Sequence, residues 1–286
     1  MVAACALLAL VSGCTALRLA YGSAPELMYW WLDRYAQFDD TQKPQMREAL
    51  GAWFVWHRRT QMPDYAQQLA RARVEVMADT TAARACEWQG EVGKRFHVAF
   101  DQAAPAIADV LLTVKPEQVK SIERRHAKAN ADYRDEYLQA DAAKRAEKTL
   151  DRTIERMETL YGSLDDAQRG RVSELLAKSP FDPEVWLAER QLRQQEATQL
   201  IRKMTAERAN REQARTALQG YMERVERSPR EAYRRYAQRL SEFNCAVAAD
   251  MHNRMSTAQR RHAAQKLAGW ESDLRAIAGV AEVASK

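Results

Sequence analysis

Apolar residues recur at helical spacing along most of the chain, and no stretch alternates apolar and polar residues with a period of two. Between residues 150 and 161, Leu150, Ile154, Met157 and Tyr161 follow one another at four, three and four residues, the spacing of a helix-packing seam. The chain is rich in Ala, Arg, Gln, Glu and Leu, which favour helices. We therefore expect an all-α protein of about ten helices, several of them long, arranged as a multi-helix bundle or an elongated helical array.

Capping residues and prolines predict where these helices begin and end. The first helix of the body is expected at Ser23-Ala24-Pro25-Glu26, where Ser caps the helix, Pro takes its first position and Glu completes a capping box. Pro63 is expected to end the second helix. Further helices are predicted at residues 40–60, 64–77, 81–99, 106–112, 116–161, 165–178, 183–225, 228–245 and 257–278.

A helix-start unit occurs four times, each time as an apolar residue, a cap candidate, two further residues and a glutamine. The first copy is Phe38-Asp39-Asp40-Thr41-Gln42, and the other copies end at Gln118, Gln168 and Gln259. A cap residue with Gln three positions later satisfies backbone amides that the helix leaves unpaired. The copies are irregularly spaced, which argues against a solenoid of stacked repeats.

The N-terminus has the pattern of a short export signal. An apolar run from Ala3 to Val11 is followed by small residues and Cys14, and the run is shorter than the ~20 residues that a transmembrane helix needs. The alternative is that residues 3–13 are an ordinary buried helix segment. Val11-Ser12-Gly13-Cys14 closely resembles the lipobox of bacterial lipoproteins. This resemblance implies a signal peptide at 1–13, acylation of Cys14, a lipidated tether at 14–22 and a single all-α periplasmic domain at 23–286.

Two further resemblances concern the body of the chain. Tyr29-Trp30-Trp31-Leu32-Asp33-Arg34-Tyr35, Asp40-Thr41-Gln42 and Trp56-His57-Arg58-Arg59-Thr60, together with the lipobox, resemble an uncharacterised family of Gram-negative lipoproteins known as a domain of unknown function. The glutamine units resemble the L-T-x-x-Q repeats of the Spy and CpxP periplasmic proteins, which are small helical cradles involved in chaperoning and envelope-stress control. By analogy with lipoproteins, Thr15 after the acylated cysteine implies transfer to the outer membrane.

The chain has four cysteines, of which Cys5 would leave with the signal and Cys14 would carry lipid. The remaining two, Cys86 and Cys245, are expected to form a disulfide because the periplasm is oxidising. Such a bond would close a loop of about 160 residues and contribute up to ~5 kcal/mol on the chain-entropy model. The alternative is two unpaired buried thiols.

No common catalytic motif is present, and none of the five histidines is three or four residues from another. We therefore predict no catalytic residue, no metal and no cofactor. Three histidines adjoin arginine pairs, and guanidinium groups bind phosphate or carboxylate. The anion-binding candidates are His57, Arg58, Arg59, Arg124, Arg125, Arg260 and Arg261. The alternative is that these arginines belong to ordinary solvated helix faces.

The predicted function is therefore non-enzymatic: a lipid-anchored envelope lipoprotein that acts as a binding, scaffold or chaperone-like module, facing the periplasm from the outer membrane. The expected partners are the membrane through Cys14 and an envelope protein or anionic lipid. Nucleic acid is not expected, because the 44 basic and 39 acidic residues give a net charge of only +5. The alternative is an envelope hydrolase acting on peptidoglycan or lipid, with a site assembled only by the fold.

Tryptophan exposure should separate the types of binding module. The relevant side chains are Trp30, Trp31, Trp53, Trp56 and Trp270. If two or more are exposed on one face, that face suits a cradle or a membrane-docking surface. If all five are buried, the protein is better described as a rigid spacer or adaptor.

Overall fold

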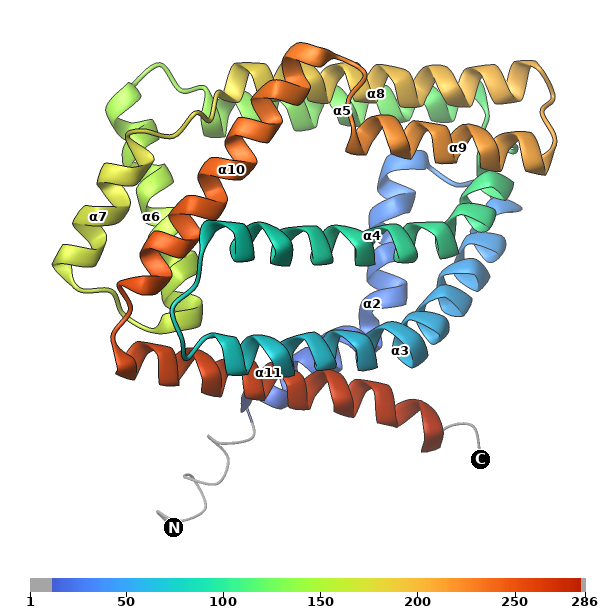
Figure 1. Ribbon diagram of the computed structural model, residues 1–286. Coiled ribbons are helices and arrows are strands. Elements are labelled where there is room, and N and C mark those ends of the chain that lie inside the picture. The colour runs from blue at the N-terminus through green and yellow to red at the C-terminus, as the bar shows by residue number, and fades with distance from the viewer. Residues whose placement is uncertain (1–11, 284–286) are drawn as a thin grey trace, which may run out of the picture.

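The computed structural model describes residues 12–283, which fold into ten helices and contain no strand (Figure 1). This confirms the prediction of an all-α, multi-helix protein. The helices are α2 (Ser12–Ala36), α3 (Gln42–Glu75), α4 (Ala82–Leu111), α5 (Pro116–Tyr137), α6 (Ala142–Tyr161), α7 (Asp166–Leu176), α8 (Pro183–Ala206), α9 (Arg211–Glu226), α10 (Glu231–Asn253) and α11 (Thr257–Val283).

The helices form an extended framework in which segments distant in sequence lie together. Helices α3 and α11 run antiparallel along one side, and α5, α8 and α9 lie on the opposite side (Figure 1). Helix α4 crosses between them and packs on α9 and α10. Helices α6 and α7 form one end of the molecule, and α2 lies toward the other end against α3.

The buried apolar residues gather in three clusters. One joins α4, α8 and α9 around Ala108 and Leu218, and a second joins α6, α7 and α10 around Val172 and Met251. The third lies between α3 and α11, where Leu267 packs with Val76 and Ala263. A core divided in this way is what an elongated helical array requires, because each cluster buries the stripes of only two or three helices.

Several expected helix boundaries are wrong because proline does not end the helices here. Helix α3 continues through Pro63, and α4 continues through Pro105. A proline inside a helix removes one backbone hydrogen bond and costs ~3 kcal/mol or more. Packing compensates around Pro63, where Met62 and Ala66 are both buried.

The helix start predicted at Ser23 is also wrong, because α2 begins at Ser12 and passes through Pro25. The stretch expected to be a tether at residues 14–22 is therefore helical. Tertiary contacts hold this first part of α2 in place. Tyr21 shares a hydrogen bond of 2.8 Å with Nδ1 of His57, and Nε of Arg18 lies 3.6 Å from Oδ1 of Asp273.

Two helices that were expected to be continuous are divided. The predicted helix 116–161 is interrupted before Asp141, whose carboxylate accepts the amides of Ala143 and Lys144 and starts α6. The predicted helix 183–225 is interrupted before Asn210, which forms a capping box with Gln213 and starts α9. Asp and Asn favour such starts because their short side chains compete with helix continuation.

Candidate functional site

The four glutamines of the helix-start units form two hydrogen-bonded pairs. Nε2 of Gln118 donates to Oε1 of Gln42 at 2.7 Å, which joins the starts of α5 and α3. Nε2 of Gln168 donates to Oε1 of Gln259 at 2.9 Å, which joins the starts of α7 and α11. Each glutamine oxygen also accepts the backbone amide three residues before it, as expected of a capping box. The sequence predicted these caps, but it did not predict that they would pair.

The pair at Gln42 and Gln118 also fixes the end of α2. Nε2 of Gln118 donates to the backbone oxygen of Gln37 at 3.1 Å, and Nε2 of Gln42 donates to the backbone oxygen of Thr113 at 2.9 Å. Both glutamines are buried. This junction therefore connects the ends of α2 and α4 with the starts of α3 and α5.

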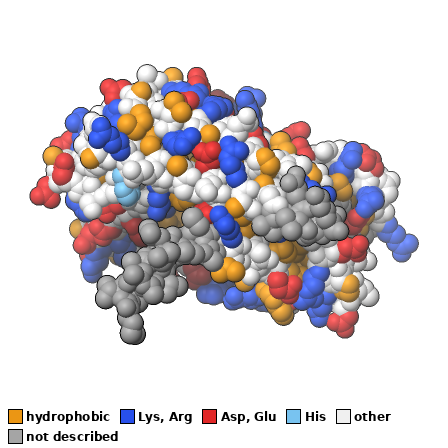
Figure 2. All heavy atoms as spheres, turned by 90° about the horizontal axis from the view of Figure 1, so that it is seen from below, with side chains coloured by type: hydrophobic (Ala, Val, Ile, Leu, Met, Phe, Trp, Pro, Cys, Tyr) orange, Lys and Arg blue, Asp and Glu red, His pale blue; other side chains and the backbone are white. Residues whose placement is uncertain are grey.

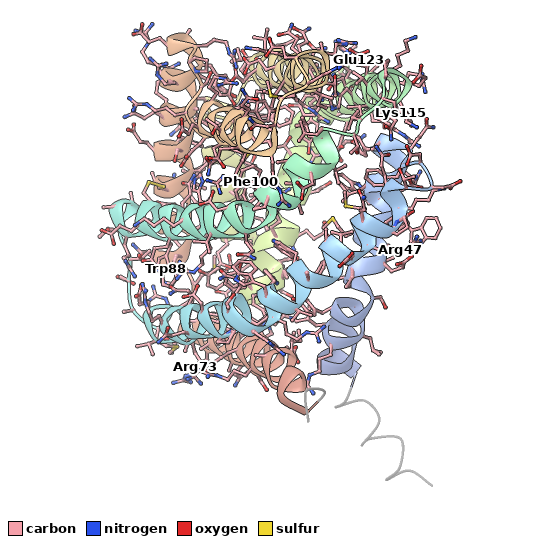
Figure 3. All side chains as sticks on the ribbon, turned by 90° about the vertical axis from the view of Figure 1, so that its right-hand side faces the viewer. Arg47, Arg73, Trp88, Phe100, Lys115 and Glu123 are labelled. Carbon is pink, nitrogen blue, oxygen red and sulfur yellow. A yellow bond between two sulfur atoms is a disulfide. The ribbon has the colours of Figure 1, made fainter. Side chains whose placement is uncertain are left out.

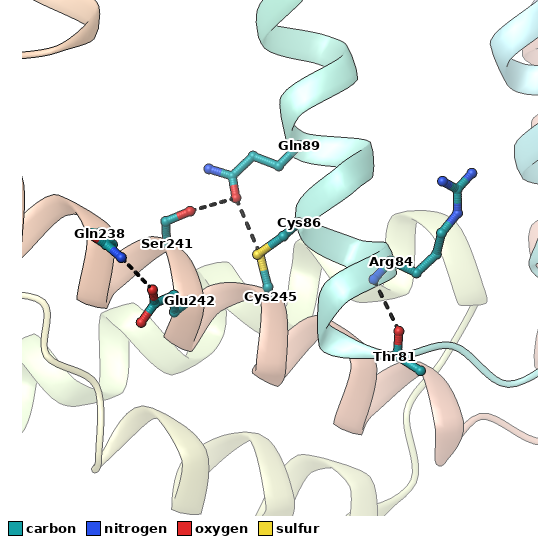
Figure 4. Close-up of a disulfide and its surroundings, with 8 residues drawn as sticks. All are labelled: Thr81, Arg84, Cys86, Gln89, Gln238, Ser241, Glu242 and Cys245. Carbon is teal, nitrogen blue, oxygen red and sulfur yellow. Dashed lines mark hydrogen bonds between the residues drawn. A yellow bond between two sulfur atoms is a disulfide. The ribbon is translucent and has the colours of Figure 1, made fainter.

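A disulfide joins Cys86 on α4 to Cys245 on α10 (Figure 4). The Cα atoms are 5.3 Å apart, within the range that a disulfide spans without backbone movement. Beside it, the hydroxyl of Ser241 donates to Oε1 of Gln89 at 3.0 Å, a second link between the same two helices. The bond connects the first third of the chain to its C-terminal part.

The three arginine–histidine clusters lie on different helices and have separate partners. The guanidinium carbon of Arg58 lies 5.5 Å from the ring centre of Tyr21. Nε of Arg125 donates to the backbone oxygen of Arg34 at 2.8 Å, and Arg260 forms an ion pair with Asp79. No hydrogen bond or ion pair within residues 12–283 joins two of these clusters. The structure therefore does not bring the predicted anion-binding residues into one site.

The remaining members of these clusters are mostly on the surface. Arg59, Arg124 and Arg261 are exposed, and the imidazole of His262 lies beside Gly162. Over the face seen from below, basic and acidic side chains are interspersed (Figure 2).

His57 belongs to the contact between α2 and α3. Besides its hydrogen bond to Tyr21, it stacks on Trp53 with ring centres 4.5 Å apart, and its Nε2 lies 3.5 Å from the hydroxyl of Tyr65. Burial lowers the pKa of His57, so the neutral imidazole is favoured. The groups described around it are aromatic rings and hydroxyls. Its immediate surroundings therefore provide contact between helices and no carboxylate for an acid–base pair.

One histidine does meet a carboxylate, because Nε2 of His97 on α4 lies 2.8 Å from Oε1 of Glu226 on α9. The Glu226 side chain is 59% exposed, so this pair lies at the surface.

Two of the five tryptophans proposed as surface candidates are exposed, and both lie on one helix. Trp30 and Trp31 on α2 are 53% and 55% exposed, whereas Trp53, Trp56 and Trp270 are half-buried. Leu27 lies three and four residues before them and is also exposed, as is Met28. Residues three and four apart share a helix face, so these side chains form one apolar strip. We name Leu27, Met28, Trp30 and Trp31 the α2 outer face.

The opposite side of α2 explains why this face points outward. Tyr29 is only 1% exposed, and the guanidinium carbon of Arg47 on α3 lies 3.7 Å from its ring centre. Seen from the side, α2 lies at the edge of the molecule next to α3, where Arg47 is labelled (Figure 3). Packing on α3 thus turns the α2 outer face away from the body.

The region from the last turn of α2 to the start of α10 matches a known family model. The match is to a family of unknown function (DUF6279) and covers residues 34–234. The chain belongs to this family. No curated protein and no solved structure matches the chain.

The DUF6279 match begins at Arg34, so the α2 outer face and all of α11 lie outside the matched residues. Within residues 12–283, no helix is long and apolar enough to cross a membrane. No group of three or more His, Cys, Asp or Glu that could hold a metal ion occurs in the same part of the chain. The predicted signal lies largely at residues 1–11, outside the described residues, and Cys14 lies in the first turn of α2.

Proposed function

We propose that this DUF6279 member is a non-enzymatic lipoprotein, held on the periplasmic face of the outer membrane by acyl chains on Cys14, with the α2 outer face resting on that membrane. The observation that carries the proposal is the position of two exposed tryptophans on the helix that contains the lipobox cysteine. Trp30 and Trp31 lie 16 and 17 residues after Cys14, a helical distance of about 25 Å at ~1.5 Å per residue. A single helix thus contains both the anchor and an apolar strip.

The composition of the α2 outer face suits a bilayer interface. Tryptophan is enriched where apolar chains meet head groups, because its large ring is apolar and its N–H needs a polar partner. Arg34 is exposed one turn beyond Trp30 and Trp31, where it can meet anionic head groups. A lipid-anchored helix with such a face gains affinity from apolar burial as well as from the acyl chains.

The rest of the molecule then serves as a rigid binding or scaffold module. The glutamine junctions and the disulfide join helices that are distant in sequence, so the framework is suited to hold surfaces in fixed positions. The expected partners are an envelope protein or an anionic lipid. The resemblance of the glutamine units to Spy and CpxP repeats supports a chaperone-like role less directly than it supports a helical framework.

Replacement of the lipidated cysteine tests the anchor. Cys14→Ala should leave the chain unprocessed or release it from the membrane fraction, and it should abolish incorporation of labelled palmitate. Cys5→Ala is the matched control, because Cys5 lies in the predicted signal and should not affect acylation. If the Cys14→Ala chain is cleaved normally and stays with the membrane, the anchor is wrong.

A further inference from the structure

A second group of aromatic side chains, from helices that follow α2 in the sequence, lines a cavity. Helices α5, α6, α7, α8 and α10 line a cavity of about 1060 Å³ that is open to solvent on one side. Cavities of about 300–1,000 Å³ are typical of sites that take up small molecules. This volume is therefore large enough for a ligand of substantial size.

One wall of the cavity is a stack of three rings. The ring centre of Tyr133 lies 4.6 Å from that of Tyr137 and 4.7 Å from that of Trp186, with interplanar angles of 24° and 21°. Leu150, Leu176 and Leu240 add apolar surface from three other helices. The lining thus offers contacts for a hydrocarbon chain or an aromatic body.

Arginine provides most of the charge around this wall. Arg152 forms an ion pair of 3.1 Å with Glu136, and its guanidinium carbon lies 4.6 Å from the Tyr137 ring centre. Arg190 lies 5.4 Å from the Trp186 ring centre. Neither Arg190 nor Arg156 forms a salt bridge with a carboxylate of residues 12–283.

The other charged groups of the lining do not reverse this balance. Asp132 is paired with Lys128 at 3.0 Å, and the guanidinium of Arg145 donates to the backbone oxygen of Gln139. Glu147 is exposed. The lining therefore has four arginines against three carboxylates, Asp132, Glu136 and Glu147.

Tyr133 leaves one polar group of this wall without a partner. Its side chain is buried, and its hydroxyl has no hydrogen-bond partner among residues 12–283. Burial raises the pKa of Tyr133 to about 12, so the hydroxyl remains protonated and able to donate. Native proteins satisfy most buried polar groups, and an exception at the wall of a cavity calls for an explanation.

We propose that this cavity binds a single-chain amphiphile with an anionic head group. Arg156 and Arg190 meet the head group, while the stacked rings and the leucines contact the chain. A free inorganic anion would leave the apolar wall unused, and a cationic amphiphile would face unpaired guanidinium groups. The site adds a ligand to the function proposed above, and it does not depend on the lipid anchor.

Isothermal titration calorimetry tests the site on the full chain with Cys14→Ser, which carries no acyl group. Monododecyl phosphate and dodecanoate, each below its critical micelle concentration, should bind at one site. Inorganic phosphate and dodecyltrimethylammonium should bind at least about tenfold more weakly, because each lacks one of the two kinds of contact. If monododecyl phosphate does not bind, or if either of these controls binds equally well, the proposal is wrong.

Substitutions in the cavity lining test whether monododecyl phosphate binds there. Arg156→Gln with Arg190→Gln should lower the affinity for monododecyl phosphate by at least about tenfold, because charge-assisted hydrogen bonds to the head group are lost. Ala146→Phe should do the same by filling the cavity. Ala146 and Arg156 are exposed, whereas Arg190 is half-buried and lies over the rings of Tyr133 and Trp186. Arg215→Gln with Arg227→Gln also removes two positive charges, from exposed positions outside the cavity lining, and should bind as the parent chain does.

Circular dichroism confirms that each variant is folded before titration. If the double arginine variant and Ala146→Phe are helical and bind with unchanged affinity, the ligand occupies another surface and the proposal fails. The result on Cys14→Ser chains is separate from the membrane fractionation, so failure of the cavity and failure of the anchor can be told apart.

Discussion

The α2 outer face and the cavity between α5, α6, α7, α8 and α10 use the same kinds of residue in opposite geometries. Trp30 and Trp31 stand more than half exposed on a single helix at the edge of the molecule. Tyr133, Tyr137 and Trp186 instead stack on one another in the wall of a hollow. A strip on one helix offers contact on one side only, which suits an extended surface. An open cavity contacts a discrete molecule on several sides, so its shape and its arginines together separate the two proposed partners.

The largest expected effect on the cavity side follows from removal of the disulfide. Cys245 follows Asn244, which lines the cavity on α10, and its bond to Cys86 fixes α10 to α4. Cys86→Ser with Cys245→Ser should destabilise the fold by up to ~5 kcal/mol and weaken monododecyl phosphate binding. Denaturant unfolding measures the loss. A double variant as stable as the parent chain would show that the two helices need no covalent link.

The next largest effect is expected near the α2 outer face, where the hydrogen-bonded pair of Gln42 and Gln118 holds the end of α2. Gln118→Ala removes hydrogen bonds to Gln42, to the backbone oxygen of Gln37 and to the amide of Lys115. Because these groups are largely shielded from water, the loss should destabilise the fold by about 2–3 kcal/mol. Gln213→Ala is the matched control. It removes an exposed capping box without a partner glutamine, and it should cost only ~1 kcal/mol. Equal losses would mean that the pairing of Gln42 and Gln118 contributes nothing beyond the cap.

Tyr133→Phe tests the wall of the cavity with a smaller expected effect. The change keeps the ring stack and removes a buried hydroxyl that has no partner among residues 12–283. The free energy of unfolding of the ligand-free chain should therefore change by less than about 1 kcal/mol, and any change should be toward higher stability. Thermal unfolding is the measurement. A large loss of stability would reveal a hydrogen bond to this hydroxyl.

The smallest predicted effect is on the pH dependence of stability. Burial lowers the pKa of His57 on α3, and burial together with Arg190 lowers the pKa of His126 on α5. The unfolded chain therefore takes up these protons at higher pH than the folded chain. Stability contributed by the neutral histidines is complete above the ordinary value of 6.5, and it is lost as pH falls from there through the folded pKa.

Comparison of unfolding at pH 7 and pH 5 should therefore show a smaller acid loss in His57→Gln and in His126→Gln than in the parent chain. His262→Gln is the control, because that imidazole is exposed. An acid loss that is the same in all four chains would show that neither histidine causes it. The carboxylate of Asp250, whose pKa is lowered to about 2 by Arg171 and Arg254, loses its stabilising effect only below its ordinary value of 3.8 and therefore outside this pH interval.

The sequence predicted what local rules control. Helical periodicity gave the fold class, and the cap at Asp165 with Gln168 formed as expected. The breaks at Asp141 and Asn210 also follow a local rule, although one continuous helix was expected at each of these places. Helix α2 continues through Pro25 and α3 continues through Pro63 because contacts with distant helices stabilise them. Prolines and capping residues alone therefore predicted these boundaries at the wrong positions.

Apart from the disulfide between Cys86 and Cys245, the features that join two distant segments were not predicted from the sequence. The glutamine pairs depend on which helix starts meet in space, and the outward direction of Trp30 and Trp31 depends on Tyr29 packing beneath Arg47. The cavity residues Arg190 and Trp186 lie four residues apart on α8, a spacing found in many solvated helices. Their contacts with Tyr133 on α5, which only the structure shows, place both residues in one site.

The most direct test measures vesicle binding and amphiphile binding on the same variant chains. Full chains with Cys14→Ser are bound to vesicles that contain brominated phosphatidylglycerol, and tryptophan quenching is compared with the affinity for monododecyl phosphate. Trp30→Phe with Trp31→Phe should lose most of the quenching and keep the affinity, whereas Arg156→Gln with Arg190→Gln should keep the quenching and lose the affinity. Unchanged quenching in the tryptophan variant, or loss of both signals together in either variant, would contradict the separation of the two surfaces.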